Sequence, residues 1–207
     1  MNEKANQMQG AVLMIDSFLD ENYAFRRNVL SGKTEVRKLS DEADRWSILT
    51  EVVLNSIVRK AKMAGFDEHS PRTDIVEFVG SDVVKDYDPI KDFLESLPEW
   101  DGQNHVAELF SRIPGLTSEQ LSWCSTWLRS AVAHWRGMDM LHGNEAVPLL
   151  IGMQGCGKST FAVRLLPPSL RAYFLDHINF SNKFDSDMAL THNLLVNIDE
   201  FANMGPS

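Results

Sequence analysis

The residues best suited to chemistry lie in the stretch GMQGCGKST, which has the pattern Gly-x-x-x-x-Gly-Lys-Ser. Glycines let a backbone curl so that its N–H groups converge on phosphate oxygens, and the helix that should follow adds partial positive charge. A lysine in this position reaches the β- and γ-phosphates, and the next hydroxyl binds Mg²⁺. The pattern therefore predicts an ATP and Mg²⁺ site whose loop comprises Gly152, Gly155, Cys156, Gly157, Lys158, Ser159 and Thr160.

A second pair of candidate residues, Asp199 and Glu200, follows the apolar run LLV, 41 residues after Lys158. In parallel-sheet NTPases a carboxylate at the end of such a strand holds the magnesium shell. We assign Ser159 and Asp199 as ligands of the metal. Glu200 is assigned as the general base that orients the attacking water, and Lys158 as the other catalytic residue. If Asp199 and Glu200 form this motif, they favour ATP hydrolysis over phosphorylation of a metabolite. The alternative is that the two residues are an acidic pair in a surface loop without a role in the site.

Cys156 lies inside the glycine loop. A thiol beside a helix N-terminus can become reactive, so alkylation there would block nucleotide binding. The alternative is a small residue that merely fits the loop.

The elements that must position these residues are a strand, a turn and a helix. VPLLI at 147–151 has the composition of a buried parallel strand, and STFAVRLL at 159–166 begins a helix. Strand, glycine loop and helix in this order are the context that the motif requires. We therefore expect residues 144–207 to form the first part of a P-loop NTPase core with a parallel sheet.

The chain before this core has a different pattern. Residues 8–20 have helical spacing, and residues 23–39 predict a β-hairpin with a glycine turn. Further helices are expected at 47–64 and about 72–85, the second capped by Thr73 or Asp74, and then from Pro89, at 104–112 and at 117–140. The last helix carries an apolar stripe that we interpret as core: Leu121, Trp123, Trp127, Leu128, Val132 and Trp135.

These patterns divide the chain into an accessory module at 1–86, a helical segment at 87–143 and the core at 144–207, a mixed α/β chain overall. The hairpin carries five basic residues, Arg26, Arg27, Lys33, Arg37 and Lys38. They form either a solvated strand face or a contact to a phosphate backbone.

Composition limits the classes of partner. The formal net charge is -9, of which residues 1–62 contribute +1 and residues 63–207 contribute -10, so any DNA contact must be local and is favoured in the first third. The sequence has no apolar run long enough to cross a bilayer. Two cysteines without metal-like spacing indicate a reducing, cytoplasmic setting.

DPIKDFLESLPEWDG, the Trp-rich segment, IGMQGCGKST and LLVNIDEF together resemble the virulence-associated protein E (VapE-like) family of phage and genomic-island proteins, which is related to superfamily-three primase-helicases. The resemblance covers about residues 87–200. It implies a P-loop ATPase core that resembles AAA+ domains. Such an ATPase works as a homo-oligomeric ring on DNA, single-stranded or at a replication fork, during replication of a mobile element. The glycine loop and the Asp199-Glu200 pair carry over as its two nucleotide-site motifs.

The resemblance also implies elements beyond residue 207, namely a polar sensor residue and an arginine finger. We therefore expect the chain to be the N-terminal portion of a helicase-type ATPase with little turnover of its own, since an arginine finger contributes about 10³–10⁵ in rate. The alternative is a nucleotide-binding or DNA- or protein-docking module without catalysis.

Overall fold

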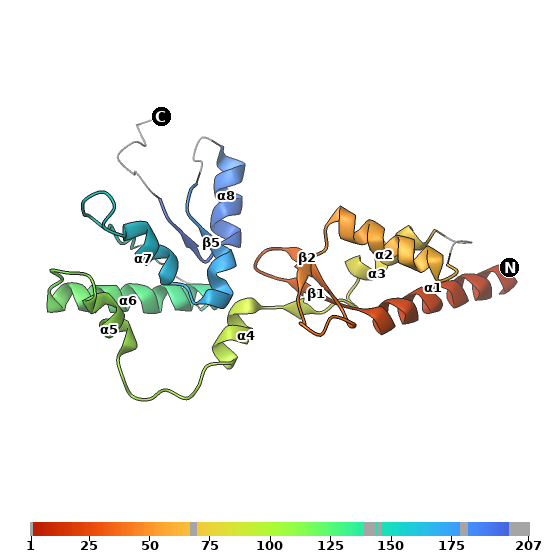
Figure 1. The fold of residues 1–207 in the computed structure, drawn as a ribbon, viewed down its shortest axis with the longest axis horizontal. Helices are drawn as coiled ribbons and strands as arrows, with labels where there is room; N and C mark the ends of the chain where they lie inside the picture. Colours follow the sequence, from red (N-terminus) through yellow and green to blue (C-terminus); the bar gives the residue numbers. More distant parts are fainter. Residues whose placement is uncertain (1, 67–69, 139–143, 145, 179–181, 199–207) are drawn as a thin grey trace. The chain divides into compact units, whose positions relative to one another are not determined.

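The computed structural model describes residues 2–66, 70–138, 144, 146–178 and 182–198. It divides into two compact units, Met1–Asp88 and Pro89–Ser207. Both combine helices with small sheets, which confirms a mixed α/β chain (Figure 1). Among the helices of these ranges, none is long and apolar enough to cross a membrane.

The first unit joins three helices to a four-stranded sheet. The helices are α1 (Asn2–Asn22), α2 (Glu51–Met63) and α3 (Pro71–Gly80), and the strands are β1 (Tyr23–Asn28), β2 (Lys33–Lys38), β3 (Ser47–Ile48) and β4 (Asp86–Tyr87). The strand order is β3-β2-β1-β4. β2 pairs antiparallel with β1 and β3, and β4 pairs parallel with β1. The hairpin expected over 23–39 is therefore confirmed, and Gly32 in its turn has a φ of 65°.

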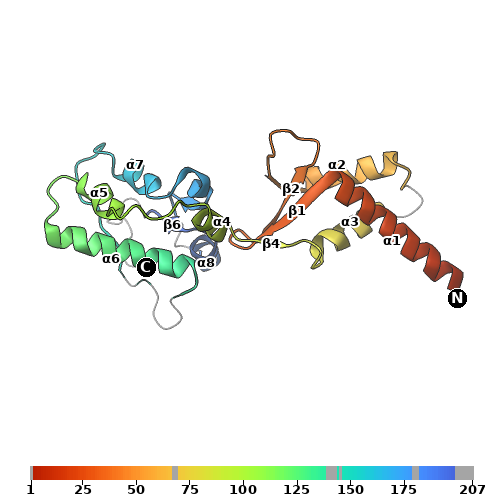
Figure 2. The same ribbon diagram turned by 90° about the horizontal axis from the view of Figure 1, so that it is seen from below.

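The core of this unit lies between the helices and one face of the sheet, as the grouping of α1, α2 and α3 beside β1 and β2 in Figures 1 and 2 illustrates. Its buried apolar side chains come from all three helices and from both hairpin strands. They are Ile15, Leu19, Tyr23, Val36, Leu54, Ile57, Val58, Ala61, Ile75, Phe78 and Val84.

Two expected helices have different boundaries. The helix expected from residue 47 begins at Glu51, because Ser47–Ile48 forms strand β3 and Thr50 caps the helix by accepting a hydrogen bond from the Val53 amide. The helix expected at 72–85 begins at Pro71 after Ser70 and ends at Gly80. Thr73 and Asp74 therefore lie inside α3 and do not cap it, because Pro71 favours the first helical position.

The second unit is mainly helical. Its helices are α4 (Pro89–Glu95), α5 (His105–Ser111), α6 (Ser118–Trp135), α7 (Lys158–Arg164), the 3₁₀ helix η1 (Pro168–Tyr173) and α8 (Lys183–His192). Strands β5 (Phe174–Leu175) and β6 (Leu195–Val196) pair parallel, with Phe174 opposite Leu195 and Leu175 opposite Val196.

The aromatic stripe of α6 is less buried than expected. Trp123 is 61% exposed, so its assignment to the core is wrong, and Ala131 is the buried residue of this helix. Trp135 is part-buried, and its indole Nε1 donates to the carbonyl oxygen of Leu194 at 2.8 Å. The C-terminal end of α6 is therefore attached to the segment that enters β6.

Candidate phosphate-binding loop

Two glycines of the loop have a left-handed backbone conformation. Gly155 and Gly157 have φ values of 76° and 91°, in the left-handed region that residues with a Cβ rarely adopt. Gly157 is the N-cap of α7, and its carbonyl oxygen accepts the hydrogen bond of the Phe161 amide at 2.8 Å. The loop therefore leads directly into a helix N-terminus, as the motif predicts.

Gly152 lies close to a side chain of its own loop. A Cβ added there would lie 2.9 Å from the Sγ of Cys156 and 4.0 Å from the Cδ of Lys158. The loop thus folds back on its own first residue, and Cys156 occupies the space that any larger residue at position 152 would need. The exposed thiol is packed against the loop backbone in this way.

The side chain of Lys158 curls over the loop. Its Nζ donates to the carbonyl oxygens of Gly152 at 3.0 Å and Met153 at 3.1 Å, and lies 3.9 Å from the Sγ of Cys156. The ammonium group is therefore held at the mouth of the loop, and a phosphate would compete with these two carbonyls for its protons. Ser159 is half-buried and Thr160 is exposed, at the start of the same helix.

α7 is anchored by apolar contacts on its inner side. Ala162 is 8% exposed and Leu166 is fully buried just after the helix. Phe161 packs edge-on against Phe110 of α5, with 5.9 Å between ring centroids. Burial of these side chains fixes the helix, so the loop has a rigid base on one side.

The strand expected before the loop is not formed. Residues 146–151 belong to no strand, and Val147, Leu149 and Ile151 are 82%, 72% and 89% exposed. The expectation of a buried parallel strand is therefore wrong for this structure. The physical reason is that an extended segment needs neighbours for its backbone hydrogen bonds, and no described strand pairs with this one.

A polar contact joins the carboxyl ends of β5 and β6. Asn197 Nδ2 donates to Asp176 Oδ1 at 2.8 Å, and the Asn197 amide donates to the carbonyl oxygen of Leu175, also at 2.8 Å. In open α/β sheets ligands bind outside this edge. The sequence analysis missed both side chains, although each follows an apolar pair.

Asp199 and Glu200, the expected second motif, lie outside the described residues. The part of the chain that is described contains no group of three His, Cys, Asp or Glu residues arranged to hold a metal ion. The Mg²⁺ assignment to Ser159 and Asp199 therefore stays a prediction.

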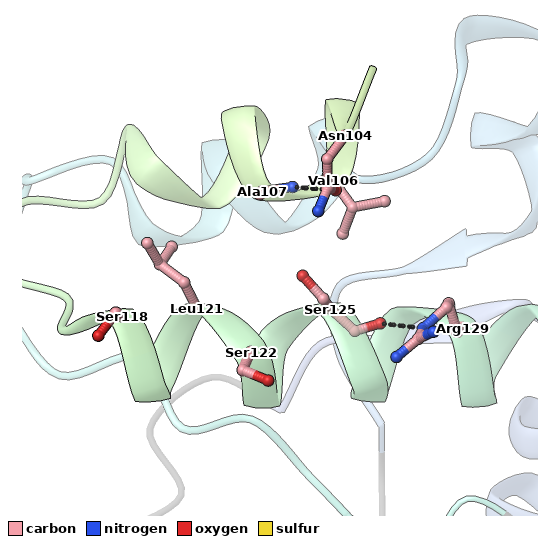
Figure 3. A pocket seen from close by; sticks show the side chains of 8 residues that line it. All are labelled: Asn104, Val106, Ala107, Ser118, Leu121, Ser122, Ser125 and Arg129. Carbon is pink, nitrogen blue, oxygen red and sulfur yellow. Dashed lines mark hydrogen bonds between the residues drawn. The ribbon is translucent and has the colours of Figure 1, made fainter. Parts of the chain in front are cut away.

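A separate cavity of about 440 Å³ lies between α5 and α6 (Figure 3). Asn104, Val106 and Ala107 line it from one side, and the α6 residues Ser118, Leu121, Ser122, Ser125 and Arg129 line it from the other. Figure 3 shows Leu121 pointing from α6 toward α5, while the Nε of Arg129 donates to the carbonyl oxygen of Ser125 on its own helix. None of the loop residues 152–160 lines this cavity, so it is not the nucleotide site expected from the motif.

Comparison with known proteins gives one match. The family model described as the virulence-associated protein E-like domain matches residues 94–207, which include the glycine loop and the Asp199-Glu200 pair. No curated protein and no solved structure matches the chain.

Proposed function

Because the chain belongs to the family of virulence-associated protein E-like domains, we propose that its second unit provides the phosphate-binding part of an ATP site in a P-loop ATPase. The single observation that carries the proposal is the loop geometry. Gly155 and Gly157 have the left-handed φ values that curl the backbone, and Lys158 Nζ lies over the carbonyls that the curl brings together. These residues fit a phosphate group.

Each residue of the loop has a role in this proposal. Lys158 would exchange its two carbonyl partners for β- and γ-phosphate oxygens, and the amides at the start of α7 would donate to the same phosphates. Ser159 would contribute its hydroxyl to Mg²⁺, which neutralises phosphate charge when it is bound. Asp199 would complete the metal shell, and Glu200 would orient the attacking water.

The proposed cellular role is that of a helicase-type ATPase of a phage or genomic island, acting as a homo-oligomeric ring on DNA. This role is supported by the match to the virulence-associated protein E-like domain and by an acidic pair after an apolar run, which suits hydrolysis better than transfer to a metabolite. A reducing, cytoplasmic location is part of the same proposal.

A second candidate function is nucleotide binding or docking without hydrolysis. The exposed run at 147–151 favours it, because a strand that is not paired does not hold the loop against a sheet that carries the catalytic acids. In that case the chain would bind ATP with its loop but would not place water and carboxylate on the γ-phosphate.

Binding of a fluorescent ATP analogue, with and without Mg²⁺, tests the proposal. Lys158→Ala should abolish binding, because it removes the charge that the loop holds at its mouth. Lys183→Ala is the matched control, since Lys183 is an exposed lysine of the same unit at the start of α8. Equal affinity of Lys158→Ala and the unsubstituted protein would show that the loop does not bind phosphate.

Hydrolysis distinguishes the two candidates. Turnover that is stimulated by single-stranded DNA and lost in Glu200→Gln would support the helicase-type ATPase. Tight binding of Mg·ATP with no turnover, alone or with DNA, would support the non-catalytic module.

A further inference from the structure

The first unit has a sheet face that its helices do not cover. Successive strand residues point to opposite faces, so the partners Phe25 and Val36 lie on the core side. Arg26 and its register partner Glu35 then lie on the opposite side. The second face is polar around Arg26, Asn28 and Glu35 and also carries the exposed Ile48, whereas Tyr23, Phe25 and Val36 on the core face pack against the helices.

On this face the guanidinium group of Arg26 lies between two aromatic rings. Its Cζ is 3.5 Å from the ring centroid of Tyr87 on β4 and 4.2 Å from that of Trp46, directly before β3. Tyr87 lies on the edge strand β4, Trp46 directly precedes the other edge strand β3, and Arg26 lies on β1, one of the two strands between them. Cation–π contacts of this kind orient the plane of an arginine.

Hydrogen bonds fix the same group from a third side. Arg26 Nε donates to Glu35 Oε2 at 2.6 Å, and Glu35 Oε1 accepts from Asn28 Nδ2 at 2.7 Å. Asn28 is 1% exposed, and its side-chain oxygen accepts from the turn amides of Leu30 and Ser31. The hairpin turn and the arginine are thus connected through one buried polar network.

The end of the guanidinium group stays available. The guanidinium group is ion-paired with Glu35 through its Nε, and within the described residues the structure shows no hydrogen bond from Nη1 or Nη2 of Arg26, whose side chain is 23% exposed. An arginine fork that is already oriented suits the oxygens of a phosphate, because little side-chain entropy is lost on binding.

The hairpin is less acidic than the rest of the chain. Residues 23–48 contain six Lys or Arg and four Asp or Glu, a net charge of +2, whereas the whole chain has a net charge of -9. Arg37 is ion-paired with Asp44, and residues 82–88, which include β4, contain three Asp and one Lys. Lys33 lies opposite Asn28 in the hairpin register, and the Cζ of Arg37 is 5.2 Å from the centroid of the Trp46 ring. The basic residues gather around the aromatic pair.

We propose that this face of the β3-β2-β1-β4 sheet binds single-stranded nucleic acid. Arg26, supported by Lys33, contacts the phosphodiester backbone, and bases stack against the faces of the Trp46 and Tyr87 rings that Arg26 does not cover. Unpaired bases are favoured over a duplex because only exposed base planes can stack on aromatic rings. This surface is distinct from the proposed ATP site, and its binding of single-stranded nucleic acid does not depend on bound ATP.

Fluorescence anisotropy with the full chain and a labelled oligothymidylate of about 16 nucleotides tests the proposal. Trp46→Ala should weaken binding by about 5- to 150-fold, the usual range for one stacking residue. Arg26→Ala should weaken binding and also lower the slope of log affinity against log salt by about 0.7, since one phosphate contact is lost. Trp46→Phe keeps a ring and should keep most of the affinity.

The matched control is Arg59→Ala/Lys62→Ala. It removes two exposed positive charges from α2, on the other side of the sheet, and should change affinity little. Circular dichroism and thermal melting of each variant establish that it is folded. Tyr87→Ala removes the other ring and replaces Trp46→Ala if that variant does not fold.

Three results would overturn the proposal. They are unchanged affinity in both folded Trp46→Ala and Arg26→Ala, an equal loss in the α2 control, or binding of a duplex as tight as that of the single strand. Lys158→Ala should bind the oligonucleotide normally, so failure of the ATP site and failure of this surface give different results.

Discussion

The close approach of Cys156 to Gly152 makes a specific prediction about the loop. In Gly152→Ala the new Cβ would lie 2.9 Å from the Cys156 Sγ, a distance too short for unstrained contact. Gly152 does not have a left-handed φ, so its backbone accepts alanine and the thiol is the obstacle. The thiol must rotate, or the loop must open.

The expected magnitude follows from overpacking. Extra methyl groups in closed, tight sites cost about 1–3 kcal/mol, and each 1.4 kcal/mol is tenfold in an equilibrium constant. Cys156 is exposed and its Sγ ends a rotatable side chain, so the cost here is at or below the low end of that range. If the strain falls on the phosphate-binding conformation, Gly152→Ala should weaken ATP binding by about 5-fold or less. Cys156→Ala alone should have little effect, because it removes only the 3.9 Å contact of Sγ with Lys158 Nζ, whose bonds to the carbonyl oxygens of Gly152 and Met153 remain.

The double variant separates this steric cause from others. Gly152→Ala/Cys156→Ala should recover most of the affinity, since the clashing atom is gone. Gly155→Ala strains the backbone itself at a φ of 76°, so Cys156→Ala should not rescue it. The assay is titration of each variant with a fluorescent ATP analogue in the presence of Mg²⁺. If Cys156→Ala restores the affinity of both Gly152→Ala and Gly155→Ala, or of neither, the steric explanation is refuted.

Three further predictions concern single side chains. Alkylation of Cys156, which is exposed, should block ATP binding, whereas Cys124 should be labelled slowly because burial raises the pKa of its thiol. Mass spectrometry measures the labelling and nucleotide titration measures the binding. A stoichiometric label on Cys156 that leaves ATP binding unchanged would contradict this prediction. Burial, and then the charges of Asp20 and Asp74, raise the pKa of Asp16, so its ionised form disfavours the fold. Asp16→Asn should therefore raise the melting temperature at pH 7 more than Glu42→Gln, which removes an exposed charge. The gain should vanish as pH falls through the raised pKa of Asp16, and a gain that does not depend on pH would argue against this cause. Asn197→Ala should lower stability by about 1 kcal/mol through loss of its bond to Asp176, and Asp176→Ala should then add little, as a double-mutant cycle measured by denaturant unfolding would show.

Local signals in the sequence predicted the hairpin and the glycine turn into helix α7 correctly, while phosphate binding by that loop stays a prediction. In the hairpin, strand-forming residues flank a turn with Gly32 at positive φ, and these contacts are close in sequence. In the loop, the positions of Gly155 and Gly157 are dictated by backbone conformation alone, and Lys158 lies within a few residues of its partners.

Features that depend on distant residues were not predictable from the pattern. An apolar run such as 147–151 forms a strand only beside partner strands, which composition does not supply. The exposure of Trp123 depends on what packs against α6, not on its helical spacing. Strand β4 pairs with β1 across more than 50 residues, and the Asp176–Asn197 contact joins residues 21 apart.

The hydrogen bond between Trp135 and Leu194 has a consequence for the order in which the second unit folds. The two residues are 59 apart, and the glycine loop lies within the interval that their contact closes. During synthesis α6 and α7 can form early from local contacts, but α6 cannot attach to β6 until residue 194 has left the ribosome. Closing an interval of this length also carries an entropy cost that local helices avoid. Assembly of the unit around the loop is therefore expected to be a late step, slower than formation of its individual helices.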